Sequence, residues 1–275
     1  MKRSGAFTPV HEAHAIEQVV FAVQFSRPVD VSIFEKIGTL SEKFRIDLPG
    51  GGDLQGFPGS MGISLPQGTI PGAPVTGKIL NRSRPDGIIE CELRIEQASV
   101  LFRTLNYTRW PNVWAQTKTY LDDLISIYLS GTELAAITLH FIDKFDCDGE
   151  PSECKPRLLL REASKYVCPH VYELTDLWHS HTGAFVHPDE KTKRLLNVNV
   201  DSRDEQRSSR VVRTISIGTV LTDQFNQPGS QPLSIDAAEI CAFVATRFVE
   251  LHSFSKTVFR DVITDEMCKR IALVD

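Results

Sequence analysis

The sequence lacks the features that identify membrane and secreted proteins. No apolar stretch approaches the roughly 18–20 residues that a membrane-spanning helix requires. The first ten residues, MKRSGAFTPV, start with basic side chains, but no apolar segment follows them, so they do not resemble a secretory signal. These absences predict a cytoplasmic protein that has no membrane partner.

The chain also lacks a large excess of charge of either sign. Its 275 residues include 30 Lys and Arg and 35 Asp and Glu, which gives a formal net charge of -5. Such a balance provides no general attraction to nucleic acid, so nucleic acid is not expected as a partner. Hydrophobic residues make up 41% of the chain, which is enough for a substantial core in one large domain or two small ones.

Closely spaced cysteines are absent as well. The six cysteines are scattered, and no two form a Cys-x-x-Cys pair, a spacing that zinc sites often use. Cys91 and Cys241 fall on the apolar faces of an expected strand and an expected helix, where a free thiol packs like a small hydrophobic side chain. We therefore expect a reducing cytoplasm.

What the chain does contain is the same order of expected elements twice. Alternating apolar and polar residues predict strands, and apolar residues at helical spacing predict helices. In the first segment, residues 1–131, we expect a strand at 16–25, a helix after Asp30, a Gly- and Pro-rich loop at 49–77, strands at 89–96 and 100–107, and a helix at 110–129.

The second segment, residues 132–275, repeats this order. We expect a strand at 137–145, a helix at 155–166, strands at 183–186, 196–200 and 211–221, a charged hairpin loop at 201–210, a helix from Asp236 to about Phe259, and a short last helix at Thr264. The predicted fold class is α+β, with duplicated β-α-β-β-(β)-α halves that contain antiparallel sheets and long amphipathic helices. The two halves are expected to pack into one body.

Several short motifs occur in a fixed order along the chain. They are Pro9-Val10-His11-Glu12, Tyr107 with Trp110, LHFIDKF at Leu139–Phe145, Leu251-His252, Phe259, and Ile263-Thr264-Asp265. In these motifs the chain resembles a sporadically distributed family of bacterial proteins whose function is not established. His140 and Asp143 stand where that family usually has Arg and Asn. The resemblance implies no reaction, and the family's patchy distribution associates it with mobile-element or phage-defence loci.

The best candidates for metal ligands lie in the segment 147–187. Cys168 and His170 form one tight pair, and His179 and His181 form another on one face of an expected strand. Zinc needs three or four nitrogen or sulfur ligands that converge tetrahedrally. Because these pairs lack a typical zinc spacing, we expect surface histidines and no bound metal or cofactor. A metal-assisted hydrolase that uses this segment is the alternative.

No pattern in the sequence identifies a catalytic residue. The chain contains no G-x-S-x-G motif. Cys168 and His170 could in principle form a nucleophile and its base, but a lone Cys near a His usually has no such role. Tyr107 and Trp110 could form a stacking platform, although an aromatic pair before a helix more often fixes how the chain enters the core.

The expected long helix near the C-terminus has more apolar residues than one face requires. Phe243, Val249 and Phe254 lie outside its regular apolar stripe, and exposed apolar patches usually mark partner surfaces. We predict that these residues contribute to a homodimer or bind another protein. The leading hypothesis is therefore a non-catalytic binding or assembly protein, with the hydrolase and a sensor of a small ligand between sheet and helix as alternatives.

Overall fold

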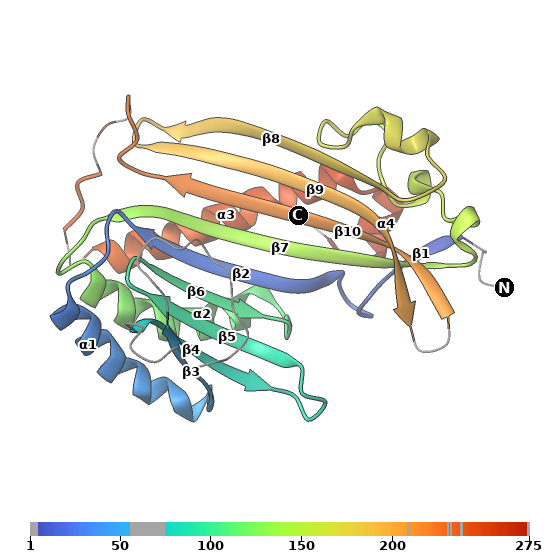
Figure 1. Ribbon diagram of the computed structural model, residues 1–275. Coiled ribbons are helices and arrows are strands. Elements are labelled where there is room, and N and C mark those ends of the chain that lie inside the picture. Colours follow the sequence, from blue (N-terminus) through green and yellow to red (C-terminus); the bar gives the residue numbers. More distant parts are fainter. Residues whose placement is uncertain are drawn as a thin grey trace. The chain divides into compact units, whose positions relative to one another are not determined.

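The computed structural model describes residues 5–55, 75–207, 210–229, 231, 233–236 and 239–273 (Figure 1). The strands are β1 (Ala6–Pro9), β2 (Ile16–Phe25), β3 (Gly50–Gln55), β4 (Val75–Ser83), β5 (Ile89–Glu96), β6 (Ser99–Thr104), β7 (Leu134–Asp148), β8 (Trp178–Asp189), β9 (Thr192–Arg207) and β10 (Arg210–Gln224). The helices are α1 (Val31–Ser41), α2 (Trp110–Tyr128), α3 (Ile240–Val262) and α4 (Asp265–Arg270). Short 3₁₀-helices are η1 (Glu42–Ile46), η2 (Pro151–Glu153), η3 (Pro156–Leu158) and η4 (Pro169–Glu173).

The structure is mostly antiparallel β-sheet, and 42% of the residues it describes are in strands and 31% in helices. The ten described strands form one sheet in the order β3-β4-β5-β6-β2-β7-β10-β9-β8, and β1 pairs with β7. The predicted fold class is therefore wrong. The described residues do not show duplicated α+β halves built around long amphipathic helices, because strands from both expected halves pair within a single sheet.

One expected helix is absent from the described residues. Residues 155–166 form a loop that includes η3 instead of a helix. Leu160 forms a β-bridge with Ile263, and the backbone N–H of Arg161 donates to the carbonyl oxygen of Val262, so the backbone here pairs with the end of α3 and does not continue as a helix. Leu159 and Leu160 are nevertheless buried, so these apolar residues pack into the core without forming a helix.

Two expected loops are strands in part. Residues 50–55 of the expected loop at 49–77 form β3, which pairs with β4, whereas residues 56–74 lie outside the described residues. The expected loop at 201–210 is mostly strand, because β9 extends to Arg207 and β10 begins at Arg210. In both places, pairing with a neighbouring strand overrides an unfavourable composition.

The chain divides into two compact units. Unit 1 comprises residues 1–19, 138–233 and 246–275, and unit 2 comprises residues 20–137 and 234–245. The proposed halves, residues 1–131 and 132–275, stay a prediction. In the described part of the chain, no helix is both long enough and apolar enough to cross a membrane.

Unit 2 contains the strand that the sequence predicts best. β5 has the predicted bounds, and Cys91, Leu93 and Ile95 on its apolar face are buried. The ring of Trp110 at the start of α2 stacks on Trp114, with ring centroids 5.9 Å apart. This contact lies within the helix, so the role of Tyr107 and Trp110 in fixing the entry of the chain stays a prediction.

Unit 1 is built around three consecutive strands. β8 pairs with β9 and β9 pairs with β10, all antiparallel. Along β9, Leu196, Val198 and Val200 are buried, while the residues between them are half-exposed. Because successive side chains of a strand point to opposite faces, this alternation gives the sheet one apolar and one polar face.

Candidate functional site

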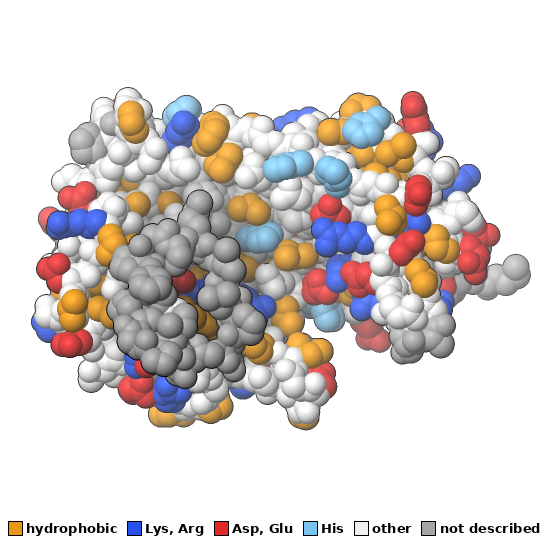
Figure 2. Space-filling model, viewed as in Figure 1, with side chains coloured by type: hydrophobic (Ala, Val, Ile, Leu, Met, Phe, Trp, Pro, Cys, Tyr) orange, Lys and Arg blue, Asp and Glu red, His pale blue; other side chains and the backbone are white. Residues whose placement is uncertain are grey.

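The polar face of the sheet in unit 1 is the candidate site, and we call it the open face. It consists of His140 on β7, His179 and His181 on β8, Asn197, Asn199 and Asp201 on β9, and Gly218 on β10. Helix α3 packs against the opposite face, where the rings of Phe145 and Phe259 lie 6.4 Å apart. In Figure 1 the strands lie in front of α3, and Figure 2 shows histidine side chains exposed over these strands.

The strand register brings the open-face residues into rows. His181 lies opposite Asn199, and Asn199 lies opposite Gly218 on the next strand. A Cβ atom at Gly218 would lie 3.5 Å from Nε2 of His140 and 3.7 Å from Cβ of Asn199. His140 and Asn199 therefore flank a position that has no side chain, which leaves backbone accessible between two polar groups.

Most side chains of the open face are uncharged hydrogen-bonding groups. Burial lowers the pKa of His140, so its imidazole is neutral near pH 7 and offers one donor and one acceptor. Asn197 and Asn199 each offer an amide donor and a carbonyl acceptor. Asp201 is charged, but its carboxylate pairs with Arg203 at 3.2 Å. The arrangement can bind polar groups by hydrogen bonding without requiring an opposite charge.

A buried ion-pair network lies on the α3 side of the sheet. The guanidinium of Arg194 donates two hydrogen bonds to the carboxylate of Asp223, at 2.6 and 2.9 Å, and both side chains are buried. Arg247 on α3 donates to Asp189 and, at 2.9 Å, to Glu250. Removing one member of such a network would leave a buried charge unpaired, so we interpret the network as structural.

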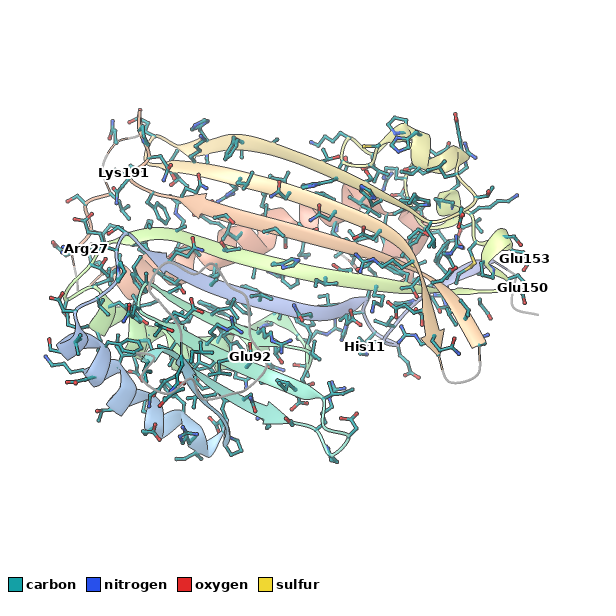
Figure 3. All side chains as sticks on the ribbon, viewed as in Figure 1. His11, Arg27, Glu92, Glu150, Glu153 and Lys191 are labelled. Atoms are coloured by element: carbon teal, nitrogen blue, oxygen red, sulfur yellow. A yellow bond between two sulfur atoms is a disulfide. The ribbon has the colours of Figure 1, made fainter. Side chains whose placement is uncertain are left out.

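A polar pocket of about 710 Å³ borders the network at Asp189. Its walls come from the turn between β8 and β9, where Lys191 is labelled in Figure 3, and from the residues after β10. The lining residues are His187, Asp189, Glu190, Lys193, Pro228, Gly229 and Gln231. The pocket thus lies at a strand turn, whereas the sensor hypothesis requires a cavity between sheet and helix.

Two ionisable groups on the α3 side are kept neutral by burial. Asp143 on β7 is 4% exposed, and burial raises the pKa of its carboxyl to about 8. Burial and the nearby Lys256 lower the pKa of His252 on α3 to about 4. The ring of His252 lies 6.1 Å from that of Phe141. Neither group faces the open face, so both bear on stability.

The structure places candidates for metal ligands near the start of β8, where the backbone N–H of Cys168 donates to the hydroxyl of Ser180 at 3.0 Å. His179 and His181 are exposed on β8, whereas Cys168 and His170 lie in the chain segment before it. Within the described residues, no group of three or more His, Cys, Asp or Glu side chains is arranged to hold a metal ion. The histidine pair belongs to the open face instead.

Cys147 and Cys154, which belong to the segment of candidate metal ligands, form a disulfide. It joins the end of β7 to η2, where the backbone N–H of Glu150 donates to the carboxylate of Glu153 at 3.3 Å (Figure 3). The sequence offered little sign of this bond, because a separation of seven residues matches no common cysteine pattern. The expectation of free thiols in a reducing cytoplasm does not account for it.

The three predicted partner residues differ in exposure. Val249 is 49% exposed, but Phe254 is only half-exposed, and Arg194 lies over its ring at 5.4 Å. Phe243 is half-exposed as well and belongs to unit 2. Phe254 therefore contributes to the ion-pair network, and a homodimer through these residues stays a prediction.

The comparisons with known proteins add no relative. No protein-family model, no curated protein and no solved structure matches this chain.

Proposed function

We propose that this chain is a non-catalytic binding or assembly protein that holds a partner protein on its open face. The observation that carries the proposal is the set of half-exposed and exposed polar side chains that defines the open face, most of which are uncharged. Function is commonly carried by such accessible groups on a rigid scaffold, because strands hold them in fixed register.

The chemistry of this face favours a protein as the partner. Nucleic-acid binding relies on Lys and Arg that neutralise phosphates, whereas the open face presents His and Asn side chains. Small-molecule sites are usually concave and apolar, whereas this face is a polar sheet surface. Protein interfaces combine neutral hydrogen-bonding groups with trapped water, and His140, Asn197 and Asn199 suit such an interface.

A substitution at the centre of the face tests the proposal. Asn199→Arg introduces a long charged side chain beside Gly218, so it should block a partner that docks there. The full-length parent and the variant would be used to isolate partners from the native host, and any candidate partner would be purified. Calorimetry with the purified partner should show binding to the parent and at least a tenfold weaker affinity for Asn199→Arg, about 1.4 kcal/mol.

Thr257→Arg is the matched control, because it adds the same side chain at an exposed position on α3, away from the open face. It should bind the partner as the parent does. Equal binding by Asn199→Arg and the parent would exclude the open face as the docking surface.

We also propose that the chain belongs to the sporadically distributed bacterial family and acts in the cytoplasm, as an accessory component of a mobile-element or phage-defence locus. The ordered motifs support the family, but the disulfide does not support a reducing compartment. Trapping thiols in intact host cells tests the location. Cys147 and Cys154 should be trapped as free thiols in the cytoplasm, and their recovery as a disulfide would contradict it.

A further inference from the structure

The outer edge of β8 has no strand partner among the described residues. β8 is the last strand in the order of the sheet and pairs on one side with β9. A strand edge of this kind presents unpaired backbone N–H and C=O groups, which can pair with another strand. We call the residues from His181 to His187 the β8 edge.

The β8 edge lacks most of the features that protect natural edge strands, although the ammonium of Lys193 on β9 lies 4.2 Å from the ring centroid of Phe185 and the register with β9 shifts after Val186. Its sequence, HTGAFVH, contains no Lys, Arg, Asp, Glu or Pro, although charged residues and proline are the usual means of preventing edge pairing. Phe185 and Val186 are 53% and 38% exposed. By contrast, β3 at the other end of the order is a short strand with three glycines and Asp53. The β8 edge therefore resembles a strand that is paired in an assembly.

The structure also limits the length of edge that can pair. Ser180 is buried, and its hydroxyl accepts a hydrogen bond of 3.0 Å from the backbone N–H of Cys168. The chain before β8 thus folds back against the start of the strand. At the other end, Pro188 has no N–H to donate. The free stretch runs from His181 to His187, and Ala184 is at its centre.

We propose that two copies of this chain pair through their β8 edges as antiparallel strands, with a twofold axis at Ala184. A second copy fits because antiparallel pairing of identical strands about such an axis is self-complementary, and twofold dimers are the commonest closed assembly. The uncharged edge also avoids placing like charges opposite each other between two chains that each have a net charge of -5.

This register gives the exposed phenylalanine a position in the interface. With the axis at Ala184, Phe185 lies opposite the partner's Gly183, and the reverse contact occurs by symmetry. An aromatic ring over a cross-strand glycine covers backbone that glycine leaves exposed. A seven-residue strand pair is smaller than a standard interface, so we expect a dissociation constant in the micromolar range.

Cysteine cross-linking in the full-length protein tests the register. Residues directly opposite in an antiparallel pair have Cα atoms about 4.5–5.5 Å apart, within the range of a disulfide. Ala184→Cys faces itself across the axis, so it should form a covalent dimer on mild oxidation. The background carries Cys168→Ser and Cys241→Ser, which remove the two half-exposed thiols. Thr182→Cys is the matched control, because it lies opposite the partner's Val186 and should cross-link far less.

The mass of the uncross-linked protein provides the second measurement. Light scattering at high micromolar concentration should give twice the chain mass for the parent, and Phe185→Lys should shift it to the monomer. Val211→Lys, at an exposed position on β10, should leave the dimer unchanged. A monomeric parent, or equal cross-linking at positions 184 and 182, would overturn the proposal. Because Asn199→Arg tests partner binding separately, failure of the dimer leaves the proposed function standing.

Discussion

Replacing Asp143 by asparagine should change how the stability of this protein depends on pH. The carboxyl of Asp143 is buried on the α3 side of β7, and burial raises its pKa from 3.8 to about 8. In the unfolded chain the carboxyl ionises near its ordinary pKa, whereas in the folded chain it keeps its proton to about pH 8. Asp143→Asn removes this ionisation and keeps the size of the side chain.

The direction and size of the effect follow from the two pKa values. Between pH 3.8 and about pH 8 the folded state binds more protons than the unfolded state. The free energy of unfolding therefore falls as the pH rises through this range. The fall is about 1.4 kcal/mol per pH unit. The stability that the protonated carboxyl of Asp143 contributes is fully present below pH 3.8 and is lost by about pH 8. From pH 5.5 to 7.5 the stability of Asp143→Asn relative to the parent should therefore rise by about 2.5 kcal/mol.

Urea unfolding at several pH values, followed by circular dichroism, measures this difference. The low pKa of His252 makes the folded protein lose stability as the pH falls from 6.5 toward 4, but both proteins carry that contribution, so it cancels in the comparison. Asp86→Asn removes a carboxylate from an exposed turn and serves as the control. A constant difference between Asp143→Asn and the parent from pH 5.5 to 7.5 would refute the assignment of a raised pKa to Asp143.

Two further predictions concern the links that hold unit 1 together. Reduction of the Cys147–Cys154 disulfide should lower the free energy of unfolding by about 2–3 kcal/mol, because the closed loop is short, and titration of the unreduced, unfolded protein should detect four thiols; six would show that the bond is absent. Arg194→Met leaves the buried Asp223 without its main partner, so it should cost about 3–5 kcal/mol in urea unfolding. Arg203 pairs with Asp201 at the surface, so Arg203→Met should lower the free energy of unfolding by less than about 1 kcal/mol. Equal losses for Arg194→Met and Arg203→Met would contradict the structural role of the network.

Local patterns were sufficient to predict several elements. β5 matches its predicted bounds because an alternation of apolar and charged residues signals a strand with one buried face. Helix α1 follows Asp30, as predicted. Even so, Glu92 on the expected polar face of β5 is buried and contacts Arg103 at 3.3 Å. Burial of a charged residue depends on partners from other strands, which local periodicity does not reveal.

The arrangement of the strands was not predictable in the same way. The repeated order of the elements suggested two similar halves. Which strands pair depends on contacts between segments that are distant in sequence, and the order of the elements does not reveal these contacts. The same limit applies to the candidate site, because His140 and Asn199 are almost 60 residues apart in sequence and become neighbours only through Gly218. The sequence did single out His179 and His181 as a pair of surface histidines on one strand face, but it could not show that they lie on the same sheet surface as His140 and Asn199.

The position of β1 has a consequence for the synthesis of this protein. β1 pairs with β7, where Phe7 lies opposite Cys147, and the carbonyl oxygen of Phe7 accepts a hydrogen bond of 2.7 Å from Arg270. These partners are made long after β1, because Thr8 and Asp146 are 138 residues apart. At about 5–20 residues per second, roughly 7–30 s pass before β7 emerges from the ribosome. The first strand must therefore stay unpaired, and accessible to chaperones, until more than half of the chain has been translated.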